Sequence, residues 1–213
     1  MIFFKNVLRF FYYILKNKIS LNELYNLCAD SVISPKAKLL GSHKISNVVI
    51  DDYTYISNNA QISLTTIGKY CSIGPNFLCG WGIHPTTGIS TSPMFYSTVR
   101  QNGFSVSASN KVIERKEIKI GNDVFIGSNV VVLDGIVIGD GAVIGAGAVV
   151  SKDIPPYAIA VGSPIQIIKY RFDDKIIKDL LELQWWNKAE EVHFDIEKNF
   201  FDVENFISSY NKK

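Results

Sequence analysis

The sequence predicts an all-β fold, a parallel β-helix in which short strands wind around a triangular prism. The first observation is a six-residue period in the second half of the 213-residue chain. A six-residue period does not match the 3.6-residue turn of an α-helix, and β-branched residues favour strands. Each hexad therefore supplies one short strand and one corner. The aliphatic residues that recur are Ile120, Ile126, Val132, Ile138, Ile144 and Val150, and glycine follows at Gly121, Gly127, Gly139 and Gly145.

The second observation is a looser form of the same period in the first half of the chain. The spacings between its aliphatic anchors are six, six and then five residues, so three hexads make one coil of about 17–18 residues. Stacked coils of this kind lie about 4.8 Å apart. The anchors are Ile33, Leu39, Ile45, Ile50, Ile56, Ile62, Ile67, Ile73 and Cys79, all expected to fill the prism interior.

The third observation is a break in the period between residues 80 and 117. No six-residue anchor occurs there, and glycine and proline at 80, 82, 85 and 93 indicate loop structure. We therefore expect an N-terminal helical segment (1–30), a β-helix (31–168) interrupted by the loop 80–117, and a C-terminal helical tail (169–213).

The N-terminal segment is basic and aromatic, with four basic side chains and no acidic one in residues 1–18. Lys5, Arg9 and Lys16 interrupt its apolar run, so no stretch reaches the roughly 20 residues of a membrane span. A secretory cleavage motif is not present either. Such a helix either packs its aromatic face on the main body or lies in a membrane interface. We expect a cytoplasmic protein, with peripheral contact at the inner face of the membrane through residues 1–18 as the alternative.

Charge and cysteine content exclude two classes of protein. Lys plus Arg number 22 and Asp plus Glu 20, a net charge of +2, whereas a nucleic-acid binder carries a strong basic excess. Cys28, Cys71 and Cys79 have neither the even number of a disulfide framework nor the paired spacing of a metal site. We expect reduced thiols, no nucleic-acid partner and no metal.

The residues just before each anchor point away from the prism. In the early coils they are polar or mixed, but in the later coils they are all apolar. An exposed apolar face of this kind needs a cover, and we expect a subunit contact there. The apolar residues are Phe125, Val131, Val137, Val143 and Val149.

The loop 80–117 contains His84 at the point where the chain leaves the prism. Long loops in compact proteins are commonly functional, and a histidine can remove a proton from a hydroxyl at neutral pH. His84 is therefore the candidate catalytic residue. His43, at a corner, and His193, in the tail, are expected to be surface residues.

Three segments resemble the hexapeptide-repeat acetyltransferases, in the branch of xenobiotic and polysaccharide O-acetyltransferases. IGPNFLCGWGIHPTTGISTSPMFYS is similar to the His-Pro loop of that branch, and IGNDVFIGSNVVVLDGIVIGDGAVIGAGAVVSKDIPPYAIAVGSPIQIIKYRF to its acetyl-CoA-binding coils. LLELQWWNKAEE is similar to its Trp-containing tail. Phe125 stands where many relatives place Trp, and Gln166 where some place Arg.

This resemblance implies a left-handed β-helix, although the general rule for parallel crossovers favours a right-handed one. It also implies a homotrimer, with acetyl-CoA as co-substrate in a groove between neighbouring subunits. The residues that match the cofactor-binding motif are Ser128, Ala146, Ser151, Lys152 and Lys169. Ser128 and Ala146 are 18 positions apart, so they are expected to stack on successive coils along one edge.

In that family the histidine at the position of His84 acts as general base, and the acceptor hydroxyl attacks acetyl-CoA directly. The resemblance implies a sugar acceptor, in a surface polysaccharide or its lipid-linked precursor. Two alternatives stay open: a xenobiotic acetyltransferase acting on a streptogramin or chloramphenicol-type hydroxyl, and a sugar N-acetyltransferase. Trp81, Phe95 and Tyr96 either line the acceptor site or pack the loop against a neighbouring subunit.

Two further classes compete with acetyl transfer. Zinc carbonic anhydrases built on the same β-helix need three histidines on one metal, but His43, His84 and His193 are scattered along this chain. A non-catalytic β-helical scaffold is the other class, and it predicts no turnover of any thioester.

Overall fold

The computed structural model describes Phe11 and residues 27–211. Apart from Phe11, the predictions for residues 1–18 therefore lie outside the described residues. Within the described part, no helix is both long and apolar enough to cross a membrane.

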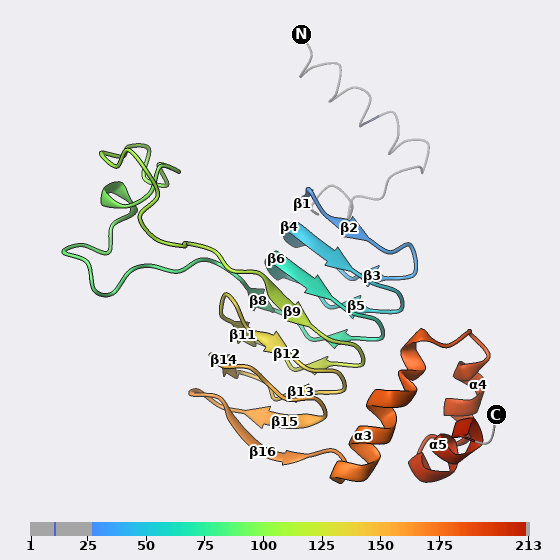
Figure 1. Ribbon diagram of the computed structural model, residues 1–213. Coiled ribbons are helices and arrows are strands. Elements are labelled where there is room, and N and C mark those ends of the chain that lie inside the picture. The colour runs from blue at the N-terminus through green and yellow to red at the C-terminus, as the bar shows by residue number, and fades with distance from the viewer. Residues whose placement is uncertain (1–10, 12–26, 212–213) are drawn as a thin grey trace.

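The predicted fold is confirmed: the chain forms a left-handed parallel β-helix with a long excursion and a helical tail (Figure 1). One sheet contains β1 (Leu27–Ala29), β2 (Val32–Ile33), β4 (His43–Ile50), β6 (Ala60–Ile67), β8 (Leu78–Cys79), β9 (Ile118–Ile120), β11 (Val131–Val132), β12 (Val137–Ile138) and β14 (Val149–Val150). The other contains β3 (Lys38–Leu39), β5 (Tyr55–Ile56), β7 (Ser72–Ile73), β10 (Phe125–Ile126), β13 (Val143–Ile144), β15 (Ala158–Val161) and β16 (Gln166–Tyr170).

The strand register has the coil length expected from the spacing of the anchors. Ile45 pairs with Ile62, 17 positions on, and Ile126 pairs with Ile144, 18 positions on. Across the excursion, Ile67 pairs with Ile120, so the prism resumes in register after the chain returns. The excursion is the predicted loop 80–117: the chain leaves the sheet after Cys79 and rejoins it at Ile118.

The anchors form a single apolar core along the axis of the prism. Aliphatic side chains and Cys79 fill it, as expected, and Ile56, Ile73, Ile126 and Ile144 are fully buried. Buried aliphatic side chains contribute about 1.5–3 kcal/mol each when removed from water. Stacking of one coil on the next is therefore the main source of stability in the β-helix.

Burial determines the reactivity of the three thiols. Cys71 and Cys79 are buried, and desolvation raises the pKa of each to about 12, whereas Cys28 is exposed. The thiolate is the reactive form. We expect iodoacetamide to modify Cys28 in the folded protein and to reach Cys71 and Cys79 only after unfolding, as counted by mass spectrometry. Modification of Cys79 in folded protein at neutral pH would contradict its place in the core.

Three predictions about the ends of the β-helix and its histidines are wrong. Residues 27–29, expected to be helical, form β1, because they pair in register with Lys44–Ser46 and add a partial coil. Lys169, expected in the helical tail, lies on β16, which pairs antiparallel with β15. His43 is buried, not exposed, because it lies on the same inward side of the continuous strand β4 as Ile45. Its Nδ1 accepts a hydrogen bond from the Ala60 amide at 3.3 Å, and burial lowers its pKa.

The tail packs its apolar side against one corner of the prism. Leu180 and Phe206 form a second buried cluster there with Tyr157 from the last coil. Asp173 begins the first tail helix by accepting a hydrogen bond from the Ile176 amide at 2.9 Å. The helices are α3 (Asp174–Leu183), η2 (Trp185–Asn187), α4 (Val192–Lys198) and α5 (Val203–Asn211), and η1 (Pro93–Phe95) lies in the excursion.

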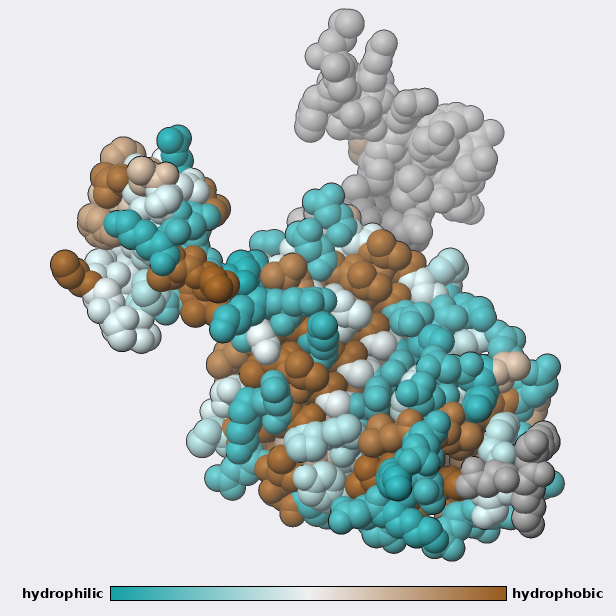
Figure 2. Space-filling view, viewed as in Figure 1, coloured by the Kyte–Doolittle hydropathy of each residue, from teal (hydrophilic) through white to brown (hydrophobic). Residues whose placement is uncertain are grey.

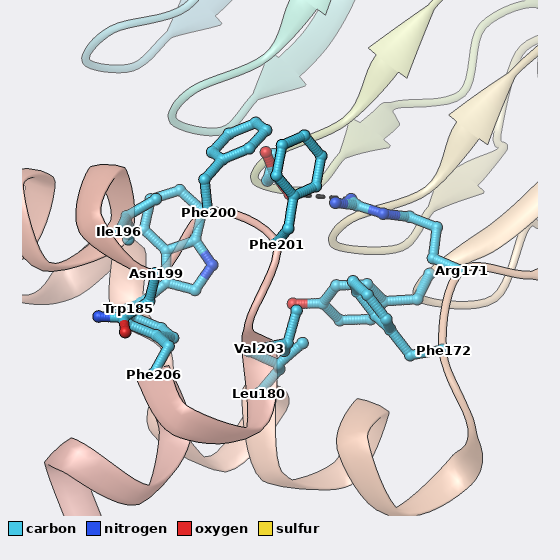
Figure 3. Close-up of a pocket in the computed structure, with 12 residues that line it drawn as sticks. Arg171, Phe172, Leu180, Trp185, Ile196, Asn199, Phe200, Phe201, Val203 and Phe206 are labelled. Atoms are coloured by element: carbon cyan, nitrogen blue, oxygen red, sulfur yellow. Dashed lines mark hydrogen bonds and ion pairs between the residues drawn. The ribbon is translucent and has the colours of Figure 1, made fainter.

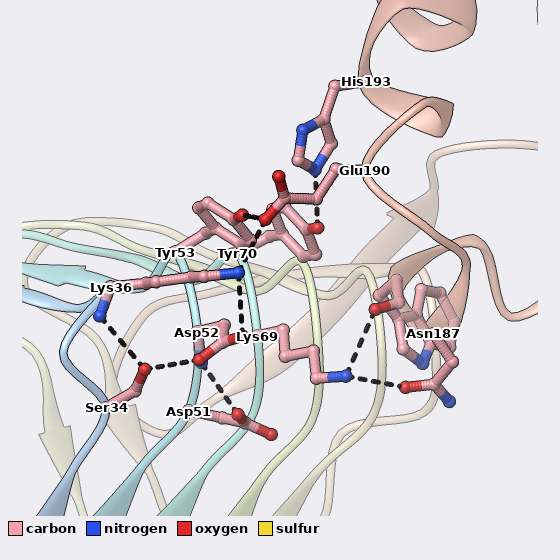
Figure 4. Close-up of polar contacts among 11 residues, drawn as sticks. Ser34, Lys36, Asp51, Asp52, Tyr53, Lys69, Tyr70, Asn187, Glu190 and His193 are labelled. Carbon is pink, nitrogen blue, oxygen red and sulfur yellow. Dashed lines mark hydrogen bonds and ion pairs between the residues drawn. The ribbon is translucent and has the colours of Figure 1, made fainter.

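Polar contacts attach the same tail to the early coils (Figure 4). The Tyr70 hydroxyl lies 2.8 Å from Nε2 of His193, so this histidine is half-buried against the prism instead of lying free on the surface. Tyr70 also stacks on Tyr53, with ring centroids 5.0 Å apart. Glu190 accepts hydrogen bonds from Lys36 and Tyr53. The tail thus spans several coils and fixes one corner of the prism.

Candidate active site

A buried carboxylate holds the root of the excursion, which is where the chain leaves the prism near Gly82 and returns to it near Lys116. The side chain of Asp134, on the corner after β11, is 2% exposed. Its Oδ2 accepts from the Gly82 amide at 2.9 Å, where the excursion leaves, and its Oδ1 accepts from the Lys116 amide at 3.2 Å, where it returns. Arg115 donates its Nε to Asp134 at 3.1 Å and its Nη2 to the Gly80 carbonyl at 2.9 Å. One carboxylate therefore joins both ends of the excursion to the coil below.

His84 lies two residues beyond this clamp, and its hydrogen bonds select one tautomer. Nδ1 is 3.0 Å from the Thr91 carbonyl oxygen and 2.8 Å from the Tyr96 hydroxyl. A carbonyl oxygen can only accept, so Nδ1 carries a proton and donates it to Thr91, with the Tyr96 hydroxyl beside the same nitrogen. In the neutral imidazole, Nε2 is then the nitrogen without a proton. The ring is oriented with a free lone pair available to accept a proton.

This assignment predicts a small effect for Tyr96→Phe. The Thr91 carbonyl alone is sufficient to hold the proton on Nδ1, and the buried aromatic ring is retained. We expect turnover to fall by less than about tenfold, since one neutral hydrogen bond contributes about 0.5–1.5 kcal/mol. Steady-state kinetics measures this, with circular dichroism as the control for folding. A loss as large as that of a His84 variant would mean that Tyr96, not Thr91, sets the tautomer.

An open pocket of about 590 Å³ lies beside His84. Its lining combines one aromatic face with amide, carboxylate and guanidinium groups. Trp81 in this lining is half-exposed, and the Lys44 ammonium lies 4.8 Å from its ring centroid. Tyr96 is buried inside the excursion, so it supports His84 and does not form a wall of this pocket. The polar lining residues are Gln101, Asn110, Glu114 and Arg115.

Ser128 and Ala146 come together on one corner of the prism, as the 18-residue spacing predicts. The Gly147 amide donates to the Ser128 carbonyl at 2.8 Å, which stacks the two turns directly. A Cβ added to Gly127 would lie 2.5 Å from the Ala146 nitrogen, so only glycine permits this close approach. The result is a shallow edge of small residues where an extended chain could contact the backbone.

The two candidate lysines lie on different faces. Lys152 follows Ser151 at the corner beyond β14, in the sheet that carries the root of the excursion, whereas Lys169 pairs with Ile159 in the other sheet. Both lysines are exposed, and neither forms an ion pair with another described residue. Each lysine ammonium group is therefore available to bind a phosphate. One subunit does not bring the two onto the same face.

Two residues of the site escaped the sequence analysis. Asp134 and Arg115 are joined only because the coils stack, and they are 19 positions apart. The one sequence feature that could have indicated Asp134 is its place in the sequence LDG, at a corner of the regular hexads. No cluster of metal-ligating side chains occurs among residues 27–211 or Phe11.

The fold places the chain in a class of proteins, the left-handed β-helices built from six-residue repeats. The family described as bacterial transferase hexapeptide (six repeats) matches residues 117–152. The chain is 37% identical to a chloramphenicol acetyltransferase of Klebsiella aerogenes, over 71% of this chain and 81% of that protein. It is 38% identical to a probable macrolide acetyltransferase of Lysinibacillus sphaericus, over 69% and 84%.

A chloramphenicol acetyltransferase of Agrobacterium fabrum is 43% identical over 56% of this chain. The matched part is 58% of that relative, less than two thirds of its length. The chain belongs to the hexapeptide-repeat acetyltransferases.

Proposed function

We propose that this protein transfers an acetyl group from acetyl-CoA to a hydroxyl of its acceptor, with His84 as general base. The observation that carries the proposal is the hydrogen bond from Nδ1 to the Thr91 carbonyl, which in the neutral imidazole leaves Nε2 without a proton, beside an open pocket. A positioned base of this kind contributes about 10²–10⁴-fold to the rate. Orientation of the two substrates contributes much of the remainder.

The reaction needs no covalent enzyme intermediate. Nε2 of His84 accepts the proton of the acceptor hydroxyl as its oxygen bonds to the thioester carbonyl carbon. The carbon–sulfur bond then breaks, the acetyl ester is released, and the imidazolium returns its proton to the sulfur of CoA. Cys79 takes no part as a nucleophile, because it lies in the core and burial raises its pKa to about 12.

A sugar is the first candidate acceptor. The pocket beside His84 presents hydrogen-bonding groups from Gln101, Asn110 and Glu114 together with the Trp81 ring. Polar groups that can bond hydroxyls, beside an aromatic face on which a sugar ring can lie, suit a carbohydrate. A hydroxyl of a surface polysaccharide or of its precursor therefore fits this lining.

A hydroxyl-bearing antibiotic is the second candidate acceptor. The 37% identical relative is named a chloramphenicol acetyltransferase, and the 38% identical relative is named a probable macrolide acetyltransferase. A separate cavity of about 620 Å³ in the excursion is lined by Ile89, Phe95 and Val106 and would suit a more apolar acceptor.

Release of CoA thiol in the presence of different acceptors distinguishes the two candidates. We expect turnover with sugars such as galactose or maltose and none with chloramphenicol or a macrolide. Turnover confined to the antibiotics, with resistance of a sensitive host, would support the second candidate instead. An acceptor amine in place of the hydroxyl tests the N-acetyltransferase alternative. No thiol release with any acceptor would favour a scaffold.

Lys152 and Lys169 are proposed to bind the phosphates of acetyl-CoA, Ser151 to contact its nucleotide end, and Ser128 and Ala146 to contact its extended arm. We expect Lys152→Ala to raise the KM for acetyl-CoA about fivefold to tenfold and to leave kcat unchanged, since a charge-assisted contact is made equally in ground and transition states. Lys178→Ala is the control, because Lys178 is an exposed cation on α3 that faces Glu182 at 3.8 Å. An unchanged KM in Lys152→Ala would remove that residue from the binding site.

The acetyl-CoA site is proposed to form between subunits of a homotrimer. Phe125, Leu133 and Val137 are each about half-exposed on the outer faces of the later coils, and Figure 2 displays hydrophobic side chains along the coils between the excursion and the tail. A contact between copies would cover such a surface and bring the faces of Lys152 and Lys169 together. Sedimentation equilibrium should give three times the monomer mass of 23.8 kDa.

A further inference from the structure

A third cavity, of about 360 Å³, lies far from the excursion, between the tail helices and the last coils (Figure 3). Its volume is within the range of small-molecule sites. It opens at the corner that carries Asp123 and Tyr157, whereas the excursion and His84 leave from a different corner. Most of its lining is apolar: Phe172, Leu180, Trp185, Ile196, Val203 and Phe206.

The hydroxyl of Tyr157 gives this cavity a polar feature. Tyr157 lines the cavity and is 1% exposed, yet its hydroxyl has no hydrogen-bond partner among the described residues. Burying a hydroxyl without a partner costs about 1–3 kcal/mol. Burial also raises its pKa, so the hydroxyl keeps its proton and remains a donor.

The Tyr157 ring is held firmly from behind. Its carbon atoms would lie 2.4 Å from a Cβ added to Gly141, so the ring packs flat on that turn. The Arg171 guanidinium lies 5.4 Å from the ring centroid. Arg171 is itself committed, since it donates to Asp123 at 2.9 Å and to the Gly141 carbonyl at 2.8 Å. The hydroxyl is thus a fixed donor. The cation in the lining, Arg171, is already paired with Asp123.

Two phenylalanines lie exposed at the rim. Phe200 and Phe201 follow α4, with ring centroids 5.0 Å apart and edge to face, and Phe201 is 94% exposed. Figure 3 shows both rings at one edge of the residues that line the cavity. Exposure of two adjacent aromatic side chains is costly, and an aromatic molecule in the cavity would cover them.

We propose that this cavity binds a neutral aromatic molecule whose carbonyl or ether oxygen accepts a hydrogen bond from the Tyr157 hydroxyl. An anion is disfavoured because Asp123 lines the same cavity and already neutralises Arg171. The site is independent of acetyl transfer at His84. Its ligand bridges the tail helices and the last coils, and it therefore stabilises the folded tail.

Benzophenone tests the proposal, because it is a neutral aromatic ketone and crosslinks to adjacent C–H bonds under ultraviolet light. We expect irradiation of the full chain to give adducts in peptides from residues 172–206, located by mass spectrometry, and saturable quenching of tryptophan fluorescence. Adducts spread evenly over the chain would overturn the proposal.

Matched variants and a matched ligand separate the hydrogen bond from simple apolar binding. Tyr157→Phe should lower the affinity for benzophenone about fivefold, which is the effect of one neutral hydrogen bond. The affinity for diphenylmethane, which lacks the carbonyl, should be unchanged. Val203→Phe should fill the cavity and abolish labelling. Phe201→Ala changes only an exposed side chain, so this variant will fold. It should lower the affinity for both benzophenone and diphenylmethane. Equal loss of both ligands in Tyr157→Phe, or full labelling in both Val203→Phe and Phe201→Ala, would refute the assignment.

Discussion

Replacing His84 with alanine is expected to lower kcat by about 10²–10⁴-fold and to leave the KM for acetyl-CoA unchanged. The imidazole is the proposed acceptor of the hydroxyl proton, and no other described side chain that lines the pocket beside it is a histidine. The rate of CoA thiol release at saturating substrate, measured with the acceptor that turns over best, gives kcat directly. Folding is checked by the thermal midpoint, which should change little because His84 is exposed.

His193→Ala is the matched histidine control. His193 lies on α4 against Tyr70 and contributes to attachment of the tail, so we expect a lower thermal midpoint with turnover preserved. His84→Asn is informative as well, since asparagine can retain the bond to the Thr91 carbonyl but cannot take a proton at neutral pH. Full activity of either His84 variant would eliminate the proposed base and leave the chain a transferase with another mechanism.

Replacing Asp134 with alanine is expected to release the root of the excursion. The change removes acceptors for the Gly82 and Lys116 amides and leaves Arg115 without its carboxylate. We expect the free energy of unfolding to fall by about 2–3 kcal/mol, because the carboxylate is buried and its partner only partly exposed. A histidine displaced by about 1 Å loses about 10²-fold in rate, so kcat should fall by that order.

Two measurements separate positioning from general destabilisation. Asp134→Asn keeps an acceptor oxygen for the amides and should recover part of kcat, and hydrogen exchange should quicken at the Gly82 and Lys116 amides in Asp134→Ala alone. Asp173→Ala removes the first hydrogen bond of α3, at a typical cost of about 1 kcal/mol, and should leave kcat intact. Unchanged kcat in Asp134→Ala, with normal exchange at the root, would show that the carboxylate does not position His84.

The coil architecture was predictable because each six-residue repeat contains its own inward-facing aliphatic anchor. Ile126 and Ile144 belong to the same column since each is an anchor of its own repeat, and a misplaced repeat would turn aliphatic side chains outward. The place of His84 at the root of the excursion followed from the break in the period. The burial of His43 did not, because an unbroken eight-residue strand runs through a position where the pattern predicts a corner.

The amino-acid sequence was sufficient to predict the prism, the excursion and the position of one histidine, because these depend on spacing along a short stretch of chain. The hydrogen bonds of His84, the Asp134 clamp and the cavity at Tyr157 could be found only in the folded chain. Each of these depends on groups that stacking or folding back brings together, such as Gly82 with Asp134, or Tyr157 with Phe206. Six-residue spacing encodes which side chains face the axis, but the contacts of outward and loop residues depend on coils and helices that lie far along the chain.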